Sequence, residues 1–102
     1  MAERSNVGLK GLRTFCVAAR LGSFRAAAEE LFVTASAVSH QIRGLEKELG
    51  ETLFDRNARD LRLTDVGRTL YEEAGPLIER LDAVVAGVTR RRKRQVIRMS
   101  VQ

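Results

Sequence analysis

The sequence predicts a mostly α-helical protein: a winged helix-turn-helix of three helices and a short β-hairpin, followed by one long dimerisation helix. Apolar residues recur at intervals of three and four along most of the chain, which is the spacing of one buried helix face. A short alternating segment near residues 53–63 is instead typical of strands. With 102 residues, the chain is long enough for one small domain and an appended element.

The first two helices are predicted over residues 9–21 and 24–31. Gly22 predicts the end of the first helix, because glycine is favoured just past a helix end. Ser23 is the expected N-cap of the second, since its hydroxyl can accept a hydrogen bond from the first turn. The apolar stripes of the two helices are formed by Leu12, Phe15, Cys16 and Ala19, and by Phe24, Ala27, Ala28 and Leu31.

A third helix is expected after the three residues Phe32, Val33 and Thr34. Thr34 is its predicted N-cap and Gly50 its predicted end. Its buried stripe is predicted to contain Val38, Ile42, Leu45 and Leu49. Two helices joined by so short a connection are typical of a helix-turn-helix unit.

The segment after Gly50 predicts a short hairpin, the wing. Residues 53–56 and 61–63 are its expected strands, because Leu61 and Leu63 alternate with Arg62. Residues 57–60 form the expected loop. The tip is predicted to present Arg56, Asn57 and Arg59.

The last helix is predicted from Asp65 to about Arg92, with Thr64 as its cap. Apolar residues on it follow a 4-3-4-3-4 spacing, which is a heptad seam that needs a partner helix. We therefore expect a homodimer. Pro76 lies inside the helix and is expected to bend it or to interrupt one hydrogen bond. The predicted interface residues are Leu70, Ala74, Leu77, Leu81, Val84 and Val88.

Composition excludes several other classes of protein. There is one histidine and one cysteine, Cys16, which is expected to be a small buried hydrophobe. No metal-ligand spacing, nucleophile motif or glycine-rich phosphate loop occurs, so we expect no enzyme, no bound metal and no cofactor. No run of 18 apolar residues and no secretion signal is found, which favours a protein of the bacterial cytoplasm, associated with the nucleoid.

Two stretches carry a family pattern. The first consists of Phe24, Ala27, Ala28, Leu31, Val33, Thr34, Val38, Ser39, Ile42, Leu45, Glu46, Leu49 and Gly50. The second consists of Leu53, Phe54, Arg56, Arg59, Leu63, Thr64 and Gly67. With these residues, spaced without a gap, the chain resembles the N-terminal DNA-binding domain and linker helix of LysR-type transcriptional regulators.

The resemblance implies double-stranded DNA as a partner, at interrupted inverted repeats near promoters, bound by dimers that often pair into tetramers. It also implies that a small-molecule effector would bind only through a further C-terminal domain. We divide the chain into a winged helix-turn-helix over residues 1–64, a linker helix with a basic hinge over 65–94, and the start of that further domain over 95–102. Residues 96–101 are expected to begin a strand.

In helix-turn-helix folds the N-terminal part of the second helix of the unit, the recognition helix, reads base edges in the major groove. In this chain the recognition helix is the third predicted helix, and its outward side presents Ala35, Ser36, Ser39, His40 and Arg43. The resemblance places the family's base and phosphate contacts at the first four of these positions. His40 lacks the fixed charge and two-pronged grip of an arginine. The alternative interpretation is an exposed histidine without a role.

Further contacts are expected around the recognition helix. Arg25 and Thr34 are candidates for phosphate contacts, and Arg56, Asn57 and Arg59 for the minor groove or phosphates. An alternative for the two wing arginines is a solvated tip or an ion pair with Asp55 or Asp60.

Net charge is distributed unevenly: +2 over residues 1–62, −3 over 63–89 and +6 over 90–102, which gives +5 in total. The basic run at 90–94 is interpreted either as a hydrated helix end and hinge or as an arm for non-specific DNA attraction. For the whole chain, the alternative function is a protein-interaction module whose working surface is the heptad helix.

Overall fold

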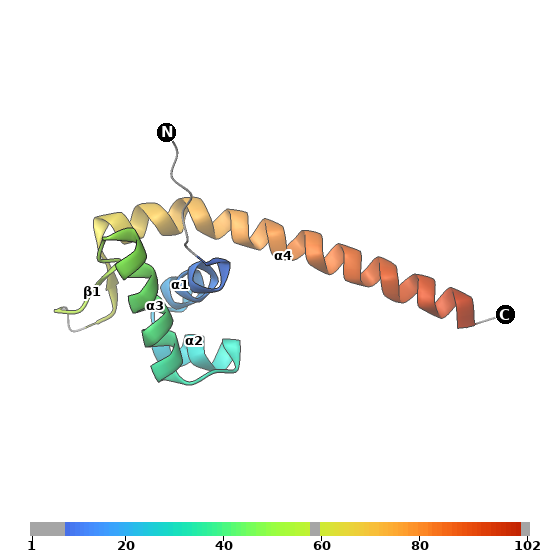
Figure 1. The fold of residues 1–102 in the computed structure, drawn as a ribbon, viewed down its shortest axis with the longest axis horizontal. Helices are drawn as coiled ribbons and strands as arrows, with labels where there is room; N and C mark the ends of the chain where they lie inside the picture. The colour runs from blue at the N-terminus through green and yellow to red at the C-terminus, as the bar shows by residue number, and fades with distance from the viewer. Residues whose placement is uncertain (1–7, 58–59, 101–102) are drawn as a thin grey trace.

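The computed structural model describes residues 8–57 and 60–100, with side chains as far as residue 92. In the described residues the order of elements is three helices, a hairpin and a long helix, as Figure 1 shows. Their bounds are α1 Leu9–Leu21, α2 Phe24–Leu31, α3 Ala35–Leu49, β1 Phe54–Asp55, β2 Arg62–Leu63 and α4 Asp65–Ser100. The predicted fold class and the predicted bounds of the first three helices are confirmed.

The short helices begin and end where local chemistry predicts. The Ser23 hydroxyl accepts from the backbone N–H of Ala26 at 3.0 Å, and the Thr34 hydroxyl accepts from that of Ala37 at 3.0 Å. Gly22 and Gly50 follow α1 and α3 in the left-handed region, with φ of 66° and 70°. Each cap satisfies backbone groups that the helix itself leaves unpaired.

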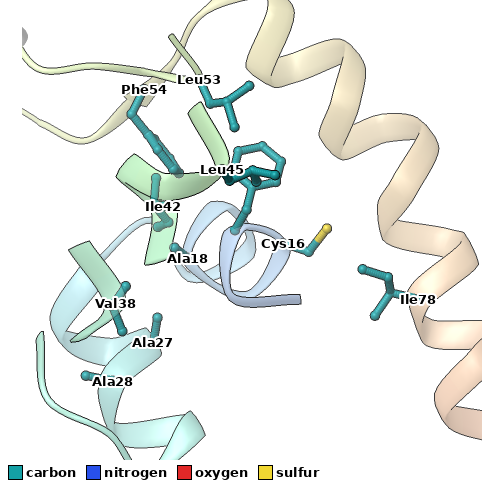
Figure 2. Packing of buried hydrophobic residues seen from close by; sticks show 11 residues of the cluster. Cys16, Ala18, Ala27, Ala28, Val38, Ile42, Leu45, Leu53, Phe54 and Ile78 are labelled. Carbon is teal, nitrogen blue, oxygen red and sulfur yellow. The ribbon is translucent and has the colours of Figure 1, made fainter. Parts of the chain in front are cut away.

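One apolar core joins the three short helices, the hairpin and the start of α4. Figure 2 shows it from close by, with Cys16 of α1 pointing toward Ile78 of α4. Its buried members are Phe15, Cys16, Ala18, Ala27, Ala28, Val38, Ile42, Leu45, Leu53, Phe54 and Ile78. Leu49, expected in the buried stripe of α3, is 38% exposed, because the last turn of α3 extends past the core.

Cys16 is buried, as predicted, and lies at the edge of the core. Burial raises the pKa of its thiol, and the charge of Arg13 opposes that effect only in part. The residue is therefore a neutral packing group and not a reactive thiolate.

The hairpin is shorter than predicted. Phe54 pairs with Leu63 and Asp55 with Arg62 in an antiparallel ladder. Leu61 and Leu63 are half-buried and Arg62 is exposed, which confirms the predicted alternation. Residues 58–59 of the loop lie outside the described residues.

Helix α4 is longer than predicted, and the strand expected over residues 96–101 is wrong as far as Ser100. The helix continues through Pro76 and through the basic run to Ser100 (Figure 1). Once a helix has formed, each further residue adds a hydrogen bond at little cost. Residues 88–102 contain no glycine or proline that would stop it. Within the described part of the chain, no helix combines the length and apolar character needed to cross a membrane.

The predicted heptad seam divides into two parts. Leu70 and Ala74, expected at a dimer interface, are half-buried and pack against the core of their own domain, together with Tyr71. Ile78 completes this contact. Leu77, Leu81, Val84 and Val88 remain exposed on α4, and Val85 lies beside them. Heptad spacing alone does not distinguish burial within one chain from burial between two.

Gly67, in the first turn of α4, is held against the segment that leads into the hairpin. The Thr64 hydroxyl accepts from the Gly67 N–H at 3.0 Å and caps the helix, as predicted. The Thr64 N–H donates to the Leu53 carbonyl at 3.0 Å. A Cβ on Gly67 would lie 2.1 Å from the same carbonyl oxygen, which is far inside contact distance. Only glycine fits without moving the backbone.

We expect Gly67→Ala to lower the free energy of unfolding by about 2–3 kcal/mol, because the new methyl group forces the backbone of Leu53 or α4 to move. Chemical unfolding followed by circular dichroism measures this. Gly87→Ala is the matched control, since a Cβ there has no neighbour within 4 Å; alanine should stabilise α4 by about 0.5–1 kcal/mol. Equal stability of Gly67→Ala and the parent would show that the contact is not tight.

Candidate nucleic-acid interface

The N-terminal half of α3 presents an exposed face over a buried one. Val38, Ile42 and Leu45 are buried and fix the rotation of the helix on the core. With about 100° per residue, Ser36, His40 and Arg43 fall on the opposite side and Ser39 on its flank, while Ala35 lies nearer the buried side, in the first turn. Of these, Ala35, Ser36, His40 and Arg43 are exposed and Ser39 is half-buried. The structure thus brings together four of the five predicted residues on one face, with Ala35 exposed at its N-terminal edge.

The surroundings of this face suit an anionic ligand. No acidic residue lies in the first turn of α3, so the positive end of the helix is unopposed. Thr34 is exposed and uses its oxygen for the cap, which leaves its hydroxyl hydrogen available to donate. Arg25 is exposed in the first turn of α2. Backbone N–H groups and cations at helix starts are common phosphate ligands.

Arg56 does not lie free at the tip of the wing. One of its terminal nitrogens donates to Glu46 Oε1 at 2.7 Å, and the side chain is 35% exposed. Its guanidinium also lies 6.0 Å from the centre of the Phe24 ring. The ion-pair partner is thus a residue of α3, and neither Asp55 nor Asp60 as considered from the sequence. Asp55 instead accepts from the backbone N–H of Asn57 at 3.0 Å.

Glu46 joins α3 to the base of the wing. Its Oε2 accepts from the backbone N–H groups of Leu53, at 2.8 Å, and Phe54, at 3.3 Å, while Oε1 accepts from Arg56. Burial by itself raises the pKa of this carboxyl, but these hydrogen bonds and the charge of Arg56 outweigh it and leave the pKa below its ordinary value. The carboxylate therefore stays ionised and holds the wing to the recognition helix.

Two residues of this region were not singled out as functional from the sequence. Glu46 is one, because nothing local indicates that its partner lies ten residues further on. Phe32 is the other: it lies in the turn before α3 with a positive φ and an exposed ring. Asn57 is exposed on the wing, as predicted, and Arg59 lies outside the described residues. Among residues 8–57 and 60–100, no cluster of potential metal ligands is found.

The fold and the exposed face of α3 define a winged helix-turn-helix DNA-binding domain. Residues 9–68 match the family described as "Bacterial regulatory helix-turn-helix protein, lysR family". The chain therefore belongs to the LysR family of bacterial transcriptional regulators and contains the family's DNA-binding domain. It is a regulator domain and not an enzyme.

Individual relatives agree with this assignment. The chain is 48% identical over 88 residues to the HTH-type transcriptional regulator TrpI of Pseudomonas aeruginosa, covering 86% of this chain and 30% of that protein. It is 49% identical over 73 residues to the glycine cleavage system transcriptional activator of Escherichia coli, covering 72% of this chain and 24% of that protein. The chain thus spans less than a third of the length of these relatives.

A solved structure extends the comparison to the fold. The crystal structure of the BenM DNA-binding domain in complex with catB site 1 DNA matches with a TM-score of 0.73 and 34% identity. The match covers 81% of this chain and 93% of that one.

We expect Glu46→Gln to lower the free energy of unfolding by about 1–2 kcal/mol at neutral pH, because a charge-assisted contact to Arg56 is replaced by a neutral one. The pKa of Glu46 is lowered by folding, so its contribution is fully present above the unfolded value of about 4.3. It is lost as the pH falls through the folded value.

Unfolding in urea at a series of pH values, for the parent and for Glu46→Gln, measures this difference. It should be constant above about pH 5 and shrink as the pH falls below about 4. Glu48→Gln is the control, since Glu48 is exposed on the same helix. A difference between Glu46→Gln and the parent that grows on acidification would contradict the assignment.

Proposed function

We propose that this domain binds double-stranded DNA sequence-specifically, as a homodimer on an interrupted inverted repeat near a promoter. The N-terminal half of α3 enters the major groove, and the wing lies at the minor groove. The observation that carries the proposal is the face of Ser36, Ser39, His40 and Arg43, with Ala35 at its N-terminal edge, which the buried side of α3 fixes in orientation.

The residues of this face have distinct tasks. Ser36, Ser39 and His40 can exchange hydrogen bonds with base edges, and Ala35 can contact a thymine methyl group. Arg43, Arg25 and Thr34 suit phosphates, which set the register of the domain on the duplex. Arg56 acts indirectly, because its ion pair with Glu46 holds the wing in place. Asn57 and Arg59 are the proposed wing contacts.

The homodimer is proposed to form through the exposed stripe of α4, which consists of Leu77, Leu81, Val84 and Val88. These side chains are 38–66% exposed in the single chain. Their 4-3-4 spacing matches the seam of paired helices, and burying them between two copies removes apolar surface from water. Pairing through α4 would fix the distance between the two recognition helices, and so the spacing of the half-sites.

Charge favours an antiparallel arrangement of the two copies of α4. Glu73 lies one turn before Leu77, and Arg91 and Arg92 lie one turn after Val88; all three are exposed. An antiparallel pair places the glutamate of one copy beside the arginines of the other. A parallel pair places like charges together, which is unfavourable.

In the full-length regulator, a small-molecule effector would act through the part of the protein that follows α4.

We expect Ser36→Leu to weaken binding to the preferred site by at least about tenfold, because the leucine removes a hydrogen-bonding group and obstructs the groove. The site is first selected from random duplexes with the parent domain. Fluorescence anisotropy then compares selected and scrambled duplexes, so that the ratio of the two affinities reports specificity.

Glu48→Leu is the matched control, on the same helix but off the proposed face, and should keep the specificity ratio. The free energy of unfolding should not change for Ser36→Leu, because Ser36 is exposed. If Ser36→Leu binds the selected duplex as the parent does, this face of α3 does not read the site.

We expect the double variant Leu77→Asp, Leu81→Asp to be monomeric at micromolar concentration, because it places charges in the middle of the proposed interface. Sedimentation equilibrium measures the mass. The control is Ala83→Asp, Ala86→Asp, which puts the same charges on exposed positions of α4 outside the stripe and should remain dimeric. A dimer of the first variant would reject the stripe as the interface.

A further inference from the structure

Helix α4 has a weak point close to where it leaves the domain. Pro76 has no N–H group, so α4 lacks a hydrogen bond there, and the proline ring crowds the preceding turn. Sharp bends in helices are most common at proline. Beyond Ile78, none of the described side chains of α4 is buried, and Figure 1 shows this part of the helix extending past the three short helices. The direction of the distal part of α4 is therefore decided close to Pro76.

The helix has room to move at this point. A cavity of about 430 Å³ lies between α4, α1 and the end of α2. It is lined by Pro76, Ile78 and Asp82 on the α4 side and by Arg13 and Arg20 on the α1 side, among others. Close packing, which would hold a helix in one orientation, is thus incomplete here. The apolar contact at Ile78 is not directional. A bend of α4 at Pro76 can narrow or widen the cavity without breaking up the core.

One directional contact joins the two sides of this cavity. Nη1 of Arg13 donates to both carboxylate oxygens of Asp82, at 2.5 and 2.6 Å. Among the described residues, it is the only ion pair that α4 forms. The two side chains are 33% and 53% exposed, and ion pairs in such positions contribute little to stability. Charged hydrogen bonds of this kind add geometric specificity, however. The pair is therefore better suited to orient α4 than to stabilise the domain.

The ion pair and the proposed dimer stripe lie on different sides of the same stretch of α4. With about 100° per residue, Asp82 is roughly 130° around the helix from the middle of the stripe formed by Leu77, Leu81, Val84 and Val88. A second copy that covers the stripe therefore leaves the ion pair in place. Each recognition helix is then connected to the paired α4 helices through the angle between α1 and α4. That angle sets the distance between the two recognition helices.

We propose that the Arg13–Asp82 ion pair fixes the direction of α4 beyond Pro76 and thereby selects the half-site spacing that the dimer accepts. The inference rests on the proposed function, because only a dimer on two half-sites has a spacing to select. One added base pair moves the half-sites about 3.4 Å apart and turns them by roughly 35°. A dimer with a fixed angle at α4 cannot follow this change, whereas a dimer that bends easily at Pro76 can.

The test measures affinity as a function of spacing. The duplex selected by the parent is prepared with its own spacer and with spacers one base pair shorter and one longer. Fluorescence anisotropy gives the affinity for each duplex, and the ratio of the affinities for the original and the altered spacers is the spacing preference. Because these duplexes carry nearly the same number of phosphates, non-specific attraction largely cancels in the ratio.

Asp82→Ala should lower the spacing preference of the parent by about three- to tenfold. Each of the two copies loses an exposed ion pair, and such a pair can favour one direction by no more than about fivefold. Affinity for a duplex with a single half-site should stay within about twofold of the parent, because Asp82 lies outside the α3 face. Arg13→Gln should have the same effect, and the double variant should have no larger effect than either change alone.

Arg20→Gln is the matched control. Arg20 lines the same cavity, but its ion pair with Glu30 joins α1 to α2 and not to α4. This variant should keep the spacing preference of the parent.

A second measurement reports the direction of α4 without DNA. Spin labels are attached to Glu48→Cys in α3 and Thr89→Cys in α4, which are both exposed positions, while the native Cys16 is buried. Doubly labelled chains are diluted into unlabelled protein, and pulsed electron paramagnetic resonance gives the distribution of distances within one chain. The parent and Arg20→Gln should show one narrow distribution, and Asp82→Ala a broader one.

Four results would overturn the proposal: no spacing preference in the parent dimer, an unchanged preference or distance distribution in Asp82→Ala, additive effects in the double variant, or an equal loss in Arg20→Gln. Failure of the proposed function is distinguishable. The parent would then select no duplex with two half-sites, while the distance measurement would still test the role of the ion pair.

Discussion

The carboxylate of Glu46 is the contact on which the arrangement of this domain depends. It accepts hydrogen bonds from the backbone N–H groups of Leu53 and Phe54 and from the guanidinium of Arg56, and so connects the recognition helix, α3, to the base of the wing. The same segment leads to α4, because the Leu53 carbonyl accepts from Thr64 and lies against Gly67. The recognition helix, the wing and the long helix are thus fixed relative to one another around residues 53–54.

Aromatic packing completes this junction from the apolar side. The Phe54 ring lies between Phe15 and Phe24, with ring centres 5.5 and 5.3 Å apart in edge-to-face geometry. Arg56 lies near the outer side of Phe24. Phe54 therefore has its backbone bound by Glu46 and its side chain held in the core. A displacement of the wing would disturb both, which explains how two strands of two residues each can keep a defined position.

Local chemistry explains which features were predictable from the sequence. The bounds of α1, α2 and α3 follow from periodicity and from caps at Gly22, Ser23, Thr34 and Gly50, all of which act within one turn. The outward face of α3 follows as the side opposite Val38 and Ile42.

The predicted end of α4 was wrong, because helix continuation depends on the preceding helix more than on the alternation of residues 96–101. The assignment of Leu70 and Ala74 to a dimer, the Glu46–Arg56 pair and the backbone of Phe32 all depend on tertiary placement, which spacing does not report.

The uninterrupted course of α4 has a mechanical consequence. With 36 residues, the helix is about 54 Å long, but it is held to the domain as far as Ile78, which is buried in the core, and Asp82, which pairs with Arg13 of α1. The part beyond Asp82 is about 27 Å long, so a bend of about 10° there would move its far end by roughly 5 Å. The first turn of α4 is held by the close approach of the Gly67 backbone to the Leu53 carbonyl, with no side chain between them. Force applied at the distal end would reach the domain first through Asp82 and Ile78, and the base of the wing through the contact between Gly67 and Leu53.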